Sequence, residues 1–145
     1  MRHGLLPIGS RAISPTFRLQ THEAANLLDG LVSVDLGQLD RSIGRKGSFP
    51  LIRAIQTGRL RYKRADPREH WKSWREMKEE LDRFGGATGD CEDLSTSVVA
   101  ELLYSGIPAR TFVYKSGPKL YHVVVKTDRW GILDPSRAAG MEGNG

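Results

Sequence analysis

Apolar residues in the second half of the chain recur at helical spacing in two segments. In the first segment they stand three or four positions apart, on one stripe of a helix: Trp71, Trp74, Met77, Leu81 and Phe84. Asp66-Pro67-Arg68-Glu69 has the residue types of a helix start, and Gly85-Gly86 those of a helix end. The pattern predicts a helix over residues 66–84 whose stripe packs into the core. The alternative is that Trp71 or Trp74 lines a substrate cleft.

The second segment predicts a helix from Asp90 to about Ser105. Asp90 has the residue type of a cap, Asp93 stands where a partial capping box needs it, and Gly106 follows as the terminator. One side of this helix carries Cys91, Leu94, Val98 and Leu102, at spacings of three, four and four. Cys91, the only cysteine of the chain, therefore follows the cap directly.

Three strand-like runs come after this helix. They cover residues 109–115, 120–126 and 130–133, with turn-forming residues at 116–119 and 127–129. Beyond Asp134-Pro135-Ser136 the Gly-rich end, residues 138–145, is expected to form a tail.

The first half of the chain has a weaker pattern. We expect an irregular arm (1–20), a short helix that Gly30 ends (21–30), a short strand (31–36), a Gly- and Arg-rich loop (41–48) and a short helix from Pro50 to Gly58. The predicted division is a basic N-terminal arm over residues 1–48, a compact domain over 49–137 and the tail.

Charge is unevenly distributed between the two halves. Residues 1–64 hold 11 Lys and Arg against 4 Asp and Glu, whereas residues 65–145 hold 11 against 13, which gives +7 and −2 and the net +5. The densest basic cluster is Arg59, Arg61, Lys63 and Arg64 around Tyr62. A solvated surface explains it, as does a site for an acidic partner. No nucleic-acid motif accompanies it, so nucleic acid is disfavoured.

Composition excludes several other classes. The chain of 145 residues is 39% hydrophobic and 27% charged, as in an ordinary globular domain. It has no apolar run of the roughly 20 residues that span a bilayer, and we do not expect residues 1–9 to act as a secretory signal, because Pro7 interrupts their short apolar patch. A single cysteine forms no internal disulfide, so a reducing setting is expected. No zinc-ligand or phosphate-loop spacing is present, so we expect neither a metal nor a cofactor.

Cys91 is the first candidate for chemistry. The unpaired N–H groups of a helix N-terminus lower the pKa of a thiol and favour the reactive thiolate. Asp90, Glu92 and Asp93 act in the opposite direction, because nearby negative charge raises the pKa of a thiol. An imidazolium partner would be needed to overcome them.

His122, in the second predicted strand, and Asp134, after the third, are the candidate partners. If residues 127–129 form the loop, Lys126 faces Trp130, and His122 then lies directly opposite Asp134. Their Cβ atoms would be roughly 4.5–5.5 Å apart, close enough for the carboxylate to orient the imidazole. Taken singly, each residue is typical of ordinary structure. Their order along the chain favours a nucleophile, a base and an orienting acid.

The surrounding residues resemble those of the transglutaminase-like thiol superfamily, in particular its bacterial and phage cysteine-peptidase-like members. The matching segments are Gly89-Asp90-Cys91-Glu92-Asp93, Gly106-Ile107-Pro108-Ala109-Arg110, Tyr121-His122-Val123 and Trp130-Gly131-Ile132-Leu133-Asp134-Pro135-Ser136. The resemblance covers residues 66–137 and implies an α+β, papain-like core in which the cysteine helix packs on a small antiparallel sheet. It also implies Cys91 as nucleophile, His122 as general base and acid, and Asp134 as orienter.

Two features depart from that family. Val123-Val124-Val125 stand where members commonly have an aromatic residue after the His, and the sheet is short. No side chain is assigned to the oxyanion hole; the backbone N–H of Cys91 is a candidate.

The first functional hypothesis is a thiol hydrolase that cleaves a peptide or amide bond of a protein or peptide substrate through an acyl-enzyme; the resemblance itself is compatible with hydrolysis, transamidation or acyl transfer. The alternative is a structural component of a tailed-phage virion (head, neck or tail) that keeps the fold with little or no catalysis. In that setting the basic arm would contact other virion or assembly proteins. The expected location is the host cytoplasm or the virion.

Overall fold

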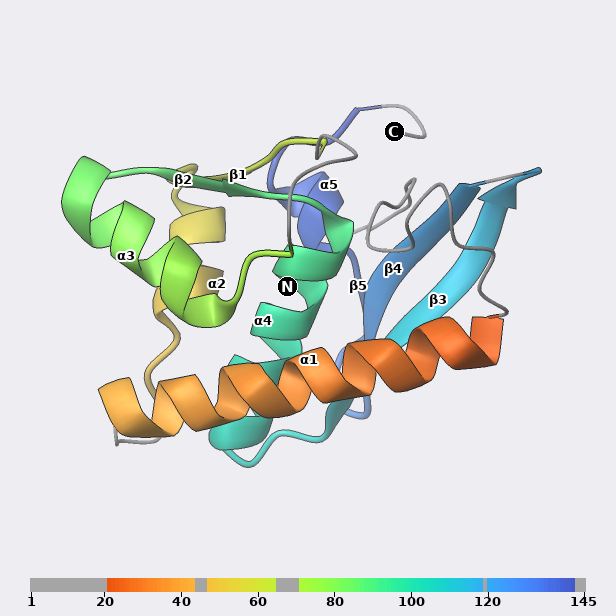
Figure 1. The fold of residues 1–145 in the computed structure, drawn as a ribbon, viewed down its shortest axis with the longest axis horizontal. Coiled ribbons are helices and arrows are strands. Elements are labelled where there is room, and N and C mark those ends of the chain that lie inside the picture. Colours follow the sequence, from red (N-terminus) through yellow and green to blue (C-terminus); the bar gives the residue numbers. More distant parts are fainter. Residues whose placement is uncertain (1–20, 44–46, 65–70, 119, 143–145) are drawn as a thin grey trace.

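The computed structural model describes residues 21–43, 47–64, 71–118 and 120–142, so the arm expected over residues 1–20 lies outside the described residues. The fold is mixed α+β (Figure 1). Its helices are α1 (Thr21–Ser42), α2 (Pro50–Gln56), α3 (Trp74–Phe84), α4 (Cys91–Tyr104) and α5 (Pro135–Ala138). Its strands are β1 (Leu60–Tyr62), β2 (Ala87–Gly89), β3 (Ala109–Gly117), β4 (Leu120–Thr127) and β5 (Gly131–Leu133).

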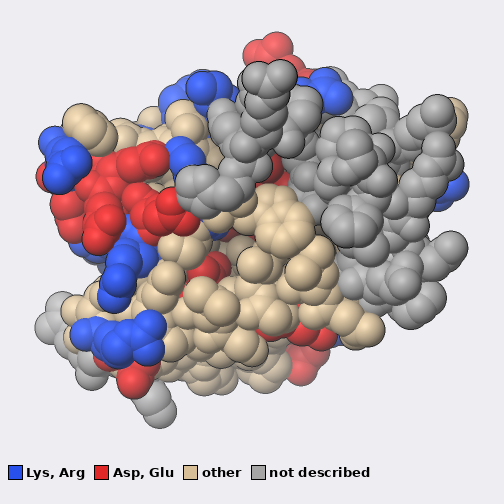
Figure 2. Space-filling model, viewed as in Figure 1, with Lys and Arg blue, Asp and Glu red and all other residues tan. Residues whose placement is uncertain are grey.

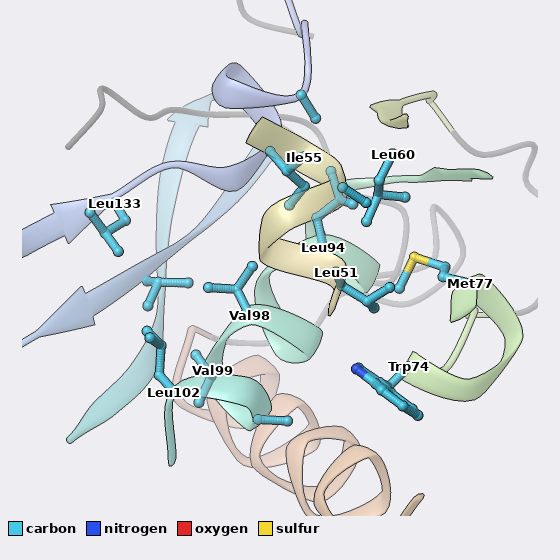
Figure 3. Close-up of a cluster of buried hydrophobic side chains, with 14 of the residues drawn as sticks. Leu51, Ile55, Leu60, Trp74, Met77, Leu94, Val98, Val99, Leu102 and Leu133 are labelled. Atoms are coloured by element: carbon cyan, nitrogen blue, oxygen red, sulfur yellow. The ribbon is translucent and has the colours of Figure 1, made fainter. Parts of the chain in front are cut away.

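Helix α4 is the centre of the fold. It is the predicted cysteine helix, and every residue from Asp90 to Leu102 is buried. Helix α1 crosses it on one side, while α2, α5 and the β3–β4–β5 sheet enclose the others (Figure 1). Figure 3 shows Leu94, Val98 and Leu102 of α4 among side chains from the surrounding elements. Because other elements surround this helix, none of its sides from Asp90 to Leu102 faces solvent. Its polar residues are therefore buried together with its apolar ones.

Helix α1 is longer than the sequence predicts. It passes through Gly30, so the helix stop expected there and the strand expected over residues 31–36 are both wrong. Leu28, Val32 and Leu39 are buried at helical spacing. Burial of each such side chain stabilises by roughly 1.5–3 kcal/mol, which outweighs the ~1 kcal/mol that a glycine costs inside a helix.

Helix α3 begins later than predicted. Residues 71–73 are not helical, and Ser73 caps the helix in a capping box with Glu76. A single helix over 66–84 is therefore wrong, although the proposed start at residues 66–69 lies outside the described residues. Trp74, Met77 and Leu81 are buried as expected, whereas Phe84 is 73% exposed. The helix ends at Gly85, as predicted, with a φ of 77°.

The antiparallel sheet has the predicted strands in a different register. Thr127 faces Gly131 and Lys126 faces Ile132, so the loop is 128–130 and not 127–129. The Thr127 hydroxyl explains the shift: it accepts the N–H of Trp130 at 2.8 Å and donates to the Gly131 carbonyl at 2.9 Å. Direct opposition of His122 and Asp134 is therefore wrong. Because β5 moves two positions along β4, both residues stay on one face.

Two features were not predicted at all. Strands β1 and β2 form a parallel pair, with Tyr62 level with Gly89. The chain after Asp134 forms α5 and then returns to the core, where Ala139 and Met141 are buried. The first residues of the expected tail are therefore packed, and α1, which lies within the segment expected as an arm, packs on α4.

Candidate active site

A closed set of hydrogen bonds fixes the N-terminus of α4. Asp90 Oδ1 accepts the backbone N–H groups of Glu92 and Asp93 at 3.1 and 3.0 Å. The Asp90 N–H donates to Asp93 Oδ2 at 3.1 Å, which completes the predicted capping box. Asp93 Oδ1 also accepts the N–H of Lys72 at 2.9 Å. Cys91 is therefore held at the first residue of a rigid helix end.

The Cys91 thiol is buried and neutral. It lies in an apolar cluster with Leu28, Val113, Val123 and Met141. Its Sγ donates to Glu92 Oε2 at 3.1 Å and accepts a hydrogen bond from the backbone N–H of Val123. Burial raises the pKa of Cys91 well above its ordinary value, and the charges of Glu92 and Asp90 raise it further. The lowering expected from the helix terminus is thus overridden.

His122 and Asp134 form the contact that the sequence suggests. His122 Nε2 lies 2.9 Å from Asp134 Oδ2, and both side chains are fully buried. Asp134 is oriented in turn, because its Oδ1 accepts the N–H of Arg137 at 3.1 Å and so caps α5. The ring of Tyr114 stands edge-on to the imidazole, with centroids 5.5 Å apart. The imidazole is therefore held on two sides.

Burial also governs the protonation of this pair. It raises the pKa of Asp134 to about 10 and lowers that of His122 well below its ordinary value. Arg137 acts on both groups as a nearby positive charge, but it is the weaker influence. At neutral pH the pair carries no net charge.

The sulfur is bound by the backbone of the strand that carries His122 and not by the imidazole. The thiol meets the backbone N–H of Val123, the residue after His122 on β4. His122 Nδ1 is buried and has no hydrogen-bond partner among the described residues. The carboxyl group and the imidazole of the predicted triad are therefore in contact, whereas the thiol lies beside β4 and donates its proton to Glu92.

Tyr62 lies at the site although nothing in the residue pattern pointed to it. It stands in the basic cluster of residues 59–64, but its ring packs against the Cys91 cluster. The parallel pairing of β1 with β2 places Tyr62 beside this cluster, and no local sequence pattern predicts that pairing. Trp74, by contrast, is not available to a substrate, because its indole N–H donates to Glu101 Oε2 at 2.9 Å in the core. Trp71 is half-buried beside the cysteine cluster.

An apolar hollow of about 470 Å³ lies between α2, α4, β5 and α5. Asp134 forms part of its wall with Ile52, Val98 and Leu133. Neither Cys91 nor His122 belongs to the described residues that line it. It therefore reaches the back of the His–Asp pair and not the sulfur.

Within the described ranges no group of three or more His, Cys, Asp or Glu side chains is arranged to hold a metal ion. No helix among the described residues is long and apolar enough to cross a membrane. Comparison of the chain with protein-family models, with curated proteins and with solved structures gives no match in any of the three.

Proposed function

We propose that the protein is a thiol hydrolase of the transglutaminase-like type, which cleaves a peptide or amide bond through an acyl-enzyme at Cys91. The observation that carries the proposal is the buried hydrogen bond of 2.9 Å between His122 and Asp134. The other ring nitrogen, Nδ1, has no partner among the described groups, and the backbone N–H next along the strand binds the sulfur. An imidazole that is held in place through one nitrogen and has no partner at the other can accept the proton of a thiol and act as a general base.

The chemistry proceeds from three groups. In the working form Asp134 is ionised, His122 carries a proton on Nε2, and Nδ1 takes the proton of the thiol. The sulfur then bonds to the substrate carbonyl carbon, and an electron pair moves onto the carbonyl oxygen. When that pair returns, the C–N bond breaks and the leaving amine takes the proton from Nδ1. Water next attacks the thioester, His122 passes the proton of that water to the sulfur, and the acid is released.

In this scheme the structure, with its buried thiol and buried His122–Asp134 pair, is the resting form of the enzyme. Both the thiol and Asp134 are neutral, and burial is the largest cause of each raised pKa. Entry of water with a substrate removes that cause and lowers both pKa values. A group that covers the sulfur must therefore move, and Met141, near the C-terminal end of the described chain, belongs to the cluster around it.

Turnover of p-nitrophenyl acetate by the full chain tests the proposal, because this activated ester reports a thiol nucleophile whatever the natural substrate is. We expect nitrophenol release to continue beyond one equivalent per protein and to be lost in Cys91→Ala. Alanine is smaller than cysteine, and the substitution keeps the helix cap at Asp90. Circular dichroism of Cys91→Ala should therefore show the wild-type fold. Equal rates for the wild type and Cys91→Ala would refute the proposal.

The second candidate is the structural component of a tailed-phage virion. The specific observation in its favour is the neutral, fully buried thiol, since lone buried cysteines usually serve as small apolar residues. Under this reading Cys91 reacts with iodoacetamide no faster than glutathione does, and Cys91→Ala assembles normally with its partners.

Charge on the described surface bears on those partners. Asp and Glu side chains gather over α3 (Figure 2), whereas Arg59, Arg61, Lys63 and Arg64 are exposed on β1 and directly before and after it. Two surfaces of opposite sign suit contacts with other proteins. In the structural reading these surfaces and the basic N-terminal segment would bind neighbouring virion proteins; in the enzymatic reading the substrate is a protein or peptide.

A further inference from the structure

Tyr62 is held rigidly beside the nucleophile. Its backbone N–H donates to the Ala139 carbonyl at 2.9 Å, and the next N–H, that of Lys63, donates to the Gly89 carbonyl at 2.9 Å. Tyr62 is thereby fixed level with Gly89, two residues before Cys91. Its ring packs against the buried cluster that contains the thiol.

The hydroxyl of Tyr62 is a buried hydrogen-bond donor without an acceptor among the described residues. It is inaccessible to solvent and has no hydrogen-bond partner among the residues that the structure describes. Buried polar groups are almost always paired, so an exception calls for an explanation. The pKa of Tyr62 is raised by burial and then by Cys91, Asp90 and Glu92, so the group stays a protonated donor near the thiol.

We propose that the Tyr62 hydroxyl donates a hydrogen bond to the oxyanion that forms on the substrate carbonyl when Cys91 attacks it. This inference rests on the proposed hydrolase function and adds a catalytic residue to it. The hydroxyl is idle in the resting form because the oxygen it serves exists only during the reaction. A donor held in advance by β1 stabilises the negative oxygen without having to reorganise. The backbone N–H of Cys91, at the start of α4, supplies the second donor.

Two reagents separate this role from an effect on the thiol itself. p-Nitrophenyl acetate acylates the sulfur through an oxyanion, whereas iodoacetamide alkylates it by displacing iodide and forms no oxyanion. Tyr62→Phe removes only the hydroxyl and keeps the ring in the cluster. Tyr104→Phe is the matched control, since its hydroxyl is bound to Asp40 at 3.2 Å, away from the site. All rates are measured on the full chain.

We expect Tyr62→Phe to slow acylation of Cys91 about 100-fold, as loss of one oxyanion donor does, and to leave the alkylation rate within about twofold of the wild type. Acylation of Tyr62→Phe at the wild-type rate would overturn the inference and leave the proposed function standing. Equal slowing of both reactions would also overturn it, because the hydroxyl would then act on the thiol or the packing. A wild type that is never acylated at Cys91 would instead refute the hydrolase.

Discussion

Glu101 offers the sharpest test of how this core is held together. The side chain is fully buried on α4, and its carboxylate accepts the N–H groups of Leu51, Ile52 and the Trp74 indole at 2.7, 3.0 and 2.9 Å. It thereby caps α2 from a distant part of the chain. Burial raises its pKa from 4.5 to about 7, in spite of these three donors.

The raised pKa sets the sign of a pH dependence. The folded protein binds a proton on Glu101 more tightly than the unfolded chain does, so the stabilisation is fully present below pH 4.5 and is lost as the pH rises through about 7. At about 1.4 kcal/mol per pH unit, the shift corresponds to about 3 kcal/mol between pH 4.5 and pH 8. Glutamine has the shape of the neutral acid and cannot ionise. Between pH 4.5 and pH 8 the free energy of unfolding should therefore fall by about 3 kcal/mol less in Glu101→Gln than in the wild type.

Urea denaturation followed by circular dichroism at pH 5 and pH 8 measures this difference. Glu101→Gln should be less stable than the wild type at pH 5, because its NH2 group cannot accept an N–H as a carboxyl oxygen does, and should gain relative to the wild type between pH 5 and pH 8. Glu101→Ala should lose about 4 kcal/mol at pH 5, because three N–H groups lose their acceptor, and clearly less at pH 8, because alanine, like glutamine, does not ionise. Glu79→Gln, on the exposed side of α3, serves as the control. If the wild type and Glu101→Gln showed the same change between the two pH values, the account of Glu101 would be refuted.

Three further substitutions probe other parts of the account. Gly30→Ala should stabilise the protein by about 1 kcal/mol in the same urea assay, because no described atom lies within 4 Å of the new Cβ in α1; a loss would contradict the continuous helix. Gly89→Ala should cost about 2 kcal/mol or more, since its Cβ would lie 2.9 Å from Met77 Sδ and 3.1 Å from Asp93 Cβ; a neutral result would contradict the packing before α4. Met141→Ala should speed alkylation of Cys91 by iodoacetamide about tenfold, because it opens the cluster around the sulfur to water and so lowers the thiol pKa; an unchanged rate would show that Met141 does not cover the thiol.

Local signals were enough to predict the elements nearest the site. The cap at Asp90, the terminator at Gly106 and the alternation of the strand runs each act within a few residues, and α4, β3 and β4 lie close to where they were expected. The contact between His122 and Asp134 followed from the pairing of neighbouring strands. It survived a wrong register because the error was two positions, which leaves the face of a strand unchanged.

Features that depend on distant contacts were not predictable in this way. Gly30 has the local properties of a helix stop, and only the packing of Leu28 and Leu39 carries α1 past it. The pairing of β1 with β2 joins short segments far apart in the chain, so Tyr62 could not be linked to Cys91 from the sequence. The protonation of Cys91 depends on how fully neighbouring elements exclude water, which the residue pattern around it does not specify.

Intact-mass measurements at timed intervals after addition of p-nitrophenyl acetate test the central claim most directly. If Cys91, His122 and Asp134 act together, one acetyl group appears on Cys91 of the wild type and then disappears. In His122→Gln, which lacks the base for the second step, any acetyl group that forms stays on the protein. Absence of acetylation at Cys91, or its removal at the same rate in both proteins, would contradict the account.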